Sequence, residues 1–344
     1  MLQAAESLST GVRMGEARVT TSRCLVALVF LLTLPSFARP QEASTSELRQ
    51  VDPYKICVSV SSVVLHATVQ NHKGTPVSGL GKDDFQVYED GVLQQIEYYS
   101  HEDIPVTVGL VVDNSGSMGP KRPEVIAAAM AFARSSNPQD QMFVVNFNEH
   151  VWYGLPFDMP FTDQTAQLQV ALSRITANGE TALYDAVAAA LDHLKKGNRD
   201  KKVLIVVSDG GDNASKHNLA QIMAMAGQSD AIIYTIGIYT EEDPDQNPNA
   251  LRQLSKATGG EAFFPQSVPE VVPLCERIAH DIRNQYTIAY APANRTQDGA
   301  YRVIQVKAMA SGYGRLSVRT RAGYYAPSKP QPSAPLAGSQ SNRP

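Results

Sequence analysis

The sequence lacks the short motifs by which many enzymes hold a nucleotide, a catalytic zinc ion or an activated serine. It contains no G-x-S-x-G, no H-E-x-x-H, no Walker loop and no G-x-G-x-x-G. Its seven histidines are scattered singly, without the spacing that metal ligands require. These absences argue against an enzyme and leave a hydrolase of unknown type as the lesser alternative.

An excess of charge of either sign is also missing. The chain has 34 acidic and 30 basic residues, which gives a net charge of −4. A nucleic-acid-binding protein would need a concentrated basic face, so we expect no nucleic-acid partner. The hydrophobic content of 43% is that of a globular protein, and 344 residues suffice for two ordinary domains.

The apolar run near the amino terminus, Cys24–Ala38, is shorter than the roughly 20 residues that cross a bilayer. It ends on Ser36-Phe37-Ala38, where small residues flank Phe37 as at a signal peptidase site. Three arginines precede it: Arg13, Arg18 and Arg23. We therefore predict a signal peptide over residues 1–38 and export to the periplasm, the cell surface or the medium.

Two details of this leader stay open. Translation starts at Met1 or at Met14, because the stretch before the apolar run is long. The alternative to cleavage is an uncleaved membrane anchor, which would be the only contact of the chain with a membrane.

Only two of the three cysteines, Cys57 and Cys275, remain after removal of the leader. Export makes a disulfide bond between them possible. We favour the simpler interpretation that both are small buried hydrophobic residues.

The two ends of the mature chain are polar. Residues 39–54 are expected to form a linker, and the Pro- and Ser-rich residues 327–344 a disordered tail.

Strand patterns occur in two separated segments. In residues 55–104, apolar residues alternate with polar ones from Val63 to Gln70, and Asp90-Gly91 supplies a tight hairpin turn. In residues 285–326 alternation returns at Tyr286, Ile288 and Tyr290. Each segment has too few strands to stand alone, so we predict one small discontinuous β-sandwich. The alternative is two separate β appendages.

Between the two segments, residues 105–284 alternate strand and helix. The apolar, β-branched runs predict strands that are buried on both faces: Val106–Val112, Met142–Phe147, Val203–Val207 and Ile232–Ile238. Helical periods separate them: Ile126–Ala133, Leu168–Ile175, Leu183–Leu194, Leu219–Met225 and Val271–Ile282. This order predicts an α/β domain with a mostly parallel sheet, inserted into the sandwich.

Polar residues gather where three of these elements begin or end. Asp113-Asn114-Ser115-Gly116-Ser117 follows one strand, Ser208-Asp209-Gly210 follows another, and Gly179-Glu180-Thr181 opens a helix. Loops at the carboxyl ends of parallel strands converge on one crevice. The resulting set of oxygens suits a hard divalent cation, Mg²⁺ first, with Mn²⁺ or Ca²⁺ as alternatives. We predict that its ligands are Asp113, Ser115, Ser117, Thr181 and Asp209.

The motif Asp113-x-Ser115-x-Ser117, with Thr181 and Asp209, resembles the metal-ion-dependent adhesion site of von Willebrand factor type A domains. The resemblance covers about residues 105–284 and implies a Rossmann-like fold. It implies that the serines and the threonine contact the metal while the aspartates largely hold its waters. The whole chain also resembles a group of bacterial exported proteins that carry such a domain.

The resemblance implies a protein-binding, adhesion-type module that grips an Asp or Glu carboxylate of its partner through the cation. The alternative is a structural or assembly module with a vestigial metal site. Other polar residues nearby receive simpler interpretations. Asp185 is expected to be structural, because acidic residues near the start of a helix interact favourably with its dipole. Asp212 and Asn213 could support a second ion, but the polarity of a surface loop explains them better.

Overall fold

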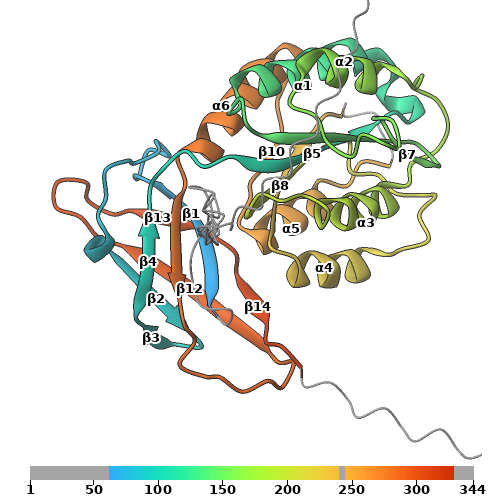
Figure 1. Cartoon of the computed structure of the whole chain (residues 1–344). Helices are drawn as coiled ribbons and strands as arrows, with labels where there is room; N and C mark the ends of the chain where they lie inside the picture. Colours follow the sequence, from blue (N-terminus) through green and yellow to red (C-terminus); the bar gives the residue numbers. More distant parts are fainter. Residues whose placement is uncertain (1–61, 240–244, 329–344) are drawn as a thin grey trace, which may run out of the picture. The chain divides into compact units, whose positions relative to one another are not determined.

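The computed structural model describes residues 62–239 and 245–328 (Figure 1). The predicted signal peptide, the expected linker and Cys57 lie outside the described residues, as do residues 329–344. Among the helices of the described part, none is both long and apolar enough to cross a bilayer. Cys275 is buried, with 2% of its surface exposed.

A six-stranded sheet forms the centre of the α/β domain, in the order β10-β9-β8-β5-β6-β7. All neighbouring pairs are parallel except β6 and β7. The strands are β5 (Val106–Asp113), β6 (Gln141–Phe147), β7 (Val151–Tyr153), β8 (Lys201–Ser208), β9 (Ala231–Gly237) and β10 (Ala262–Phe263). The predicted α/β fold with a mostly parallel sheet is therefore confirmed.

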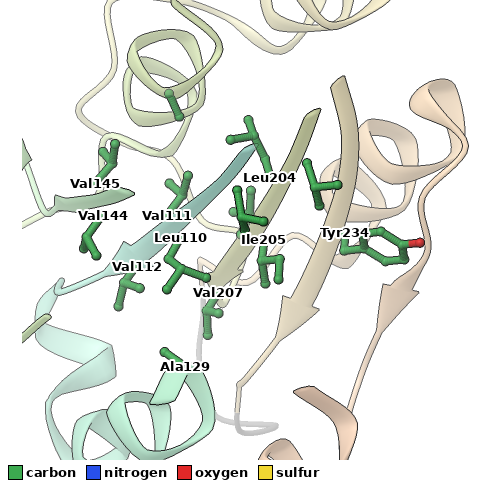
Figure 2. Close-up of a cluster of buried hydrophobic side chains, with 14 of the residues drawn as sticks. Leu110, Val111, Val112, Ala129, Val144, Val145, Leu204, Ile205, Val207 and Tyr234 are labelled. Carbon is green, nitrogen blue, oxygen red and sulfur yellow. The ribbon is translucent and has the colours of Figure 1, made fainter. Parts of the chain in front are cut away.

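The central strands are buried on both faces, which explains their unbroken apolar sequences. All eight residues of β5 are buried. Figure 2 shows part of this core, in which side chains of β5, β6, β8 and β9 lie together with Ala129. Gly109 of β5 makes the close packing possible, because a Cβ atom there would lie 2.4 Å from the ring of Phe143.

Helices cover both faces of this sheet (Figure 1). Helices α1 (Arg122–Ser135), α2 (Thr165–Ser173) and α6 (Val271–Arg283) lie on one face. On the other face are α3 (Leu183–Leu194), α4 (Leu219–Gln228) and α5 (Pro248–Thr258). The described residues also contain three short 3₁₀ helices: η1 (Lys82–Asp84), η2 (Gly116–Lys121) and η3 (Val268–Glu270).

Sequence reasoning missed helix α5. Its sequence is mostly polar, and its buried stripe is narrow, with Leu251 and Leu254 as its large apolar members. Its amino-terminal cap is Asn247, whose side chain accepts a hydrogen bond from the Ala250 N–H at 3.1 Å. Asn followed by Pro is a start signal that the apolar period alone does not reveal.

Two four-stranded antiparallel sheets, ordered β13-β1-β11-β4 and β14-β12-β2-β3, enclose a second core. Strands from the first segment are β1 (Val63–Gln70), β2 (Phe85–Glu89), β3 (Val92–Gln94) and β4 (Ile96–Ser100). The second segment gives β11 (Tyr286–Tyr290), β12 (Tyr301–Ala308), β13 (Ser317–Arg319) and β14 (Gly323–Tyr325). Strand β11 pairs with β1 and β4, and β12 pairs with β2, so each sheet mixes both segments as the discontinuous sandwich requires.

Two local predictions in the sandwich can be compared with the structure. Asp90 and Gly91 form the β2–β3 turn with φ angles of 48° and 82°, as the hairpin signal predicted. The sequence predicts a disordered tail from Pro327 onward. In the structure, the Pro327 carbonyl accepts a hydrogen bond from the Gly299 N–H at 3.3 Å, and Ser328 forms an isolated antiparallel β-bridge with Asp298. Order therefore extends at least two residues further than expected.

A buried lysine begins strand β8. Lys201 is 2% exposed, and its ammonium group donates a hydrogen bond to the Ile282 carbonyl near the end of α6. Burial lowers the pKa of Lys201 from 10.5 to about 7, although the carboxylates of Asp140 and Asp103 oppose the shift. In the unfolded chain the lysine keeps its ordinary pKa.

The unfolded chain therefore binds more protons than the folded chain between about pH 7 and pH 10.5, and stability from this group rises with pH in that window. We predict that Lys201→Met flattens the rise of the free energy of unfolding by up to about 1.4 kcal/mol per pH unit. The free energy of unfolding of each protein is measured by urea unfolding at pH 7, 8 and 9. The control is Lys202→Met, on the half-buried neighbour. An equal slope in the wild type and in Lys201→Met would contradict the prediction.

Candidate metal site

Two buried aspartates lie at the carboxyl edge of the parallel sheet. Asp113 is the last residue of β5, and Asp209 directly follows β8. They are 1% and 2% exposed. The neighbouring strands are in register, with Val112 opposite Val207, so the two carboxylates reach the same place on the sheet edge.

Serine hydroxyls connect the two carboxylates. One oxygen of Asp113 accepts the Ser115 N–H at 2.8 Å, and the other accepts the Ser208 hydroxyl at 2.6 Å. The Ser115 Oγ lies 3.2 Å from the Ser117 Oγ, which in turn donates to the Asp209 carboxylate at 2.5 Å. Four of the five predicted ligands therefore form one hydrogen-bonded chain.

The fifth predicted ligand, Thr181, is held beside this chain by its backbone. Its N–H donates to the Asn213 side-chain oxygen at 2.8 Å, and its carbonyl accepts the Asn213 N–H at 3.0 Å. Two residues earlier, the Gly179 carbonyl accepts the Gly116 N–H at 3.1 Å, which ties this loop to the one that carries Ser115 and Ser117. Thr181 itself is 7% exposed.

The electrostatics of the site favour a cation. Burial, and after it the nearby Asp209 carboxylate, raise the pKa of Asp113 from 3.8 to about 7. Hydrogen bonds from Ser208 and Ser115 act in the opposite direction. A divalent cation would favour the ionised form of Asp113, because an opposite charge within a few ångströms lowers a carboxyl pKa.

The donor set fits a hard divalent ion. Its groups are carboxylate and hydroxyl oxygens, which Mg²⁺ prefers to nitrogen and sulfur. Among the described residues, no group of three or more His, Cys, Asp or Glu side chains is arranged to hold a metal. Two carboxylates are present here, so a bound ion would depend on the serine and threonine hydroxyls and on water.

Sequence reasoning did not select several residues that shape this site. Ser208 is part of the Ser208-Asp209-Gly210 motif, but the sequence does not predict its hydrogen bond to Asp113. Asn148, 3% exposed, donates to the Asn178 carbonyl at 3.1 Å and accepts the Ala182 N–H at 2.7 Å through its own carbonyl. Asn148 follows β6, so the same rule of strand carboxyl ends would have pointed to it.

Asp212 and Asn213 lie in a surface loop, and both also hold the backbone near Thr181. Asn213 supports the backbone of Thr181, and the Asp212 carboxylate accepts the Tyr184 N–H at 2.9 Å. The structural interpretation of Asp185 agrees with its contacts. Its carboxylate accepts the backbone N–H groups of Lys216 and His217, both at 3.0 Å.

Comparison with known proteins identifies the family that this region resembles. Residues 108–212 match the family model of the von Willebrand factor type A domain, a range that holds all five predicted ligands. This part of the chain is therefore a von Willebrand factor type A domain. No curated protein matches the chain.

Solved structures resemble the fold at low identity. A von Willebrand factor type A protein from Catenulispora acidiphila is 15% identical with a TM-score of 0.49, and the match covers 78% of this chain and 76% of that one. The von Willebrand factor domain of the type V pilus tip protein Mfa5 from Porphyromonas gingivalis is 14% identical with a TM-score of 0.43, covering 52% and 95%. BatB from Bacteroides thetaiotaomicron is 14% identical with a TM-score of 0.42, covering 52% and 98%.

The support that Asn213 gives to Thr181 leads to a prediction. Asn213→Ala removes the acceptor of the Thr181 N–H, so the Thr181 hydroxyl loses its fixed position. We expect Mg²⁺ affinity, measured by calorimetric titration, to fall by roughly 10- to 100-fold, as is typical for groups that orient metal ligands.

A matched control is Asn71→Ala. The Asn71 side chain also accepts backbone N–H groups, from Lys73 and Thr75, but in a turn of the sandwich. Its loss should leave Mg²⁺ affinity unchanged. Equal Mg²⁺ affinity in both variants would show that Asn213 does not position a metal ligand.

Proposed function

We propose that this chain is an exported, non-enzymatic binding protein that grips a carboxylate of its partner through one divalent cation. Von Willebrand factor type A domains are often adhesion or protein-interaction modules. The observation that carries the proposal is the chain of hydrogen bonds that runs from Asp113 through Ser115 and Ser117 to Asp209 at the sheet edge.

The cation is most simply Mg²⁺, which takes six oxygens at about 2.0–2.1 Å and usually keeps some waters. Mn²⁺ and Ca²⁺ are the alternatives. The chain offers five protein oxygens, from Asp113, Ser115, Ser117, Thr181 and Asp209, several of them through water. A position then remains for a ligand from outside, and the positive charge of the ion favours an anionic oxygen such as an Asp or Glu carboxylate.

The residues around the cation have distinct tasks in this proposal. Ser208 and the Ser115 N–H hold the two oxygens of Asp113 in fixed directions. The Gly211 N–H does the same for Asp209, at 2.9 Å. Preorganised carboxylates do not have to be reoriented when the ion binds, so binding does not incur the entropy cost of ordering them.

The second candidate is a structural or assembly module in which the metal site is vestigial and the sandwich makes the contacts. Exposed apolar side chains favour it. Val92, Leu93 and Val303 on the sandwich are 56%, 58% and 54% exposed. Exposed apolar groups of this kind occur at protein interfaces, although single ones are common on any surface.

Replacement of one carboxylate separates the two candidates. Asp113→Ala should abolish Mg²⁺ binding in a calorimetric titration, because it removes a buried charge that holds the water shell of the ion. The melting temperature should not fall, because the variant also removes a buried carboxylate that lies close to Asp209. The control is Asp192→Ala, on the exposed surface of α3, where Asp192 pairs with Lys195. Wild-type Mg²⁺ binding by Asp113→Ala would refute the proposed ligand set.

A partner recovered by pull-down should depend on the ion in the same way. We expect its binding to be lost both in chelator and in Asp113→Ala. A partner that binds equally to the wild type, the variant and the chelated protein would refute the metal grip and favour the sandwich as the contact surface.

Export is tested on protein from the native host. Cleavage after Ala38 predicts that amino-terminal sequencing begins at or near Arg39. Soluble cytosolic protein that starts at Met1 or Met14 would contradict this prediction.

A further inference from the structure

Acidic side chains surround the proposed metal position. We call Glu149, Glu180, Asp212 and Asp245 the acidic rim. Glu149, Glu180 and Asp245 are exposed and Asp212 is half-buried. They come from four different loops, all of which reach the carboxyl edge of the sheet or the start of α3.

On one side of the site, Glu149 and Glu180 lie against the loop that precedes Thr181. The Glu149 carboxylate accepts the Glu180 N–H at 3.2 Å, and a Cβ atom on Gly179 would lie 1.8 Å from the same carboxylate oxygen. Because the Gly179 carbonyl also accepts the Gly116 N–H, the Glu149 carboxylate and the backbone of Glu180 lie next to the loop that carries the ligand serines.

On the other side, Asp212 belongs to the loop that follows Asp209, and Asp245 lies against that loop. The side-chain N–H of Asn213 donates to the Asp245 carboxylate at 3.4 Å, while the oxygen of the same amide accepts the Thr181 N–H. The Asp245 carbonyl would lie 2.9 Å from a Cβ atom on Gly211. Glu180 directly precedes Thr181, and Asp212 follows Asp209 by three residues. Glu149 and Asp245 contact the loops in which these residues lie.

The basic side chains of the same loops do not balance this charge. Arg174 and Lys216 are exposed, and neither forms an ion pair within the described part of the chain. His150 lies 3.8 Å from Glu149, and His217 lies 2.6 Å from Asp185. A bound dication would offset Asp113 and Asp209, so the net charge of the rim would remain negative.

We infer that the site selects a partner carboxylate that is flanked by lysine or arginine. This inference rests on the proposed function: the acidic residue of the partner binds the cation, and its basic neighbours meet Glu149 and Glu180. A partner segment with several acidic residues would be repelled by the same rim. Charge complementarity of this kind governs the choice of partner and the association rate more than it governs total affinity.

Three synthetic peptides of equal length test the inference, with blocked ends: Gly-Gly-Asp-Gly-Gly, Lys-Gly-Asp-Gly-Lys and Glu-Gly-Asp-Gly-Glu. Binding to the full mature chain is followed by the fluorescence of Trp152, the single tryptophan, whose ring lies 5.6 Å from that of His150 beside Glu149. Titrations are run in Mg²⁺ and in EDTA, at low and at high salt.

In Mg²⁺ and low salt, the lysine-flanked peptide should bind roughly 5- to 10-fold more tightly than the glycine-flanked one, since exposed charge pairs are weak. The glutamate-flanked peptide should bind least. The preference should shrink at high salt, because salt screens exposed charges.

In the double variant Glu149→Gln/Glu180→Gln, the ratio of the lysine- to the glycine-flanked affinity should fall towards one. The double variant Glu97→Gln/Glu276→Gln removes the same charge from exposed positions on β4 and α6 and should keep the wild-type ratio.

The outcomes separate the inference from the proposed function. If all three peptides bind equally in Mg²⁺ and none binds in EDTA, the metal grip stands and the inference about flanking charge is overturned. If both double variants lower the ratio equally, net charge and not the rim is responsible, and the inference is likewise overturned. If no peptide binds in Mg²⁺, the carboxylate grip itself fails.

Discussion

The parallel pairing of β5 with β8 is the contact on which the candidate site depends. It joins seven residues of each strand, from Val106 opposite Lys201 to Val112 opposite Val207. The next residues, Asp113 and Ser208, thereby meet at 2.6 Å between side-chain oxygens, and Asp209 follows. A shift of one residue in this register would turn each of these side chains to the opposite face of the sheet. The apolar core thus fixes the position of the polar site.

The site is costly to the fold. Asp113 is almost fully buried next to a second carboxylate, and both burial and that neighbour raise its pKa to about 7. Hydrogen bonds from Ser115 and Ser208 offset part of this cost but not all of it. Apolar residues of similar size would satisfy the core better, because isolated buried carboxylates destabilise proteins. A bound cation would offset the cost of burying these carboxylates. Buried polar groups that destabilise a core are expected at functional sites.

The elements that the sequence predicted well are those in which pattern and environment coincide. The four central strands are continuous β-branched runs because helices cover both faces of their sheet. The predicted ends of two of these strands placed Asp113 and Asp209 at the carboxyl edge of the sheet, where the structure also has them. Prediction was weaker where burial is partial, as in α5, or where pairing is short, as in β7 with three residues. The roles of Ser208 and Asn213 could not be predicted, because a hydrogen bond between distant loops depends on rotamers and turns that residue spacing does not encode.

The topology also keeps the site away from the sandwich. Strand β4 ends at Ser100 and β5 begins at Val106, so the sandwich joins the α/β domain at the amino end of β5, whereas Asp113 lies at its carboxyl end. The return connection lies at Gln285, which follows α6 and whose amide donates to Thr68 of β1 and to Tyr234 of β9, both at 3.1 Å. The return connection is thus held by side-chain hydrogen bonds from Gln285 to one strand of each part. The loops at the carboxyl edge of the sheet do not take part in these contacts. They are therefore available to bind an ion and a partner.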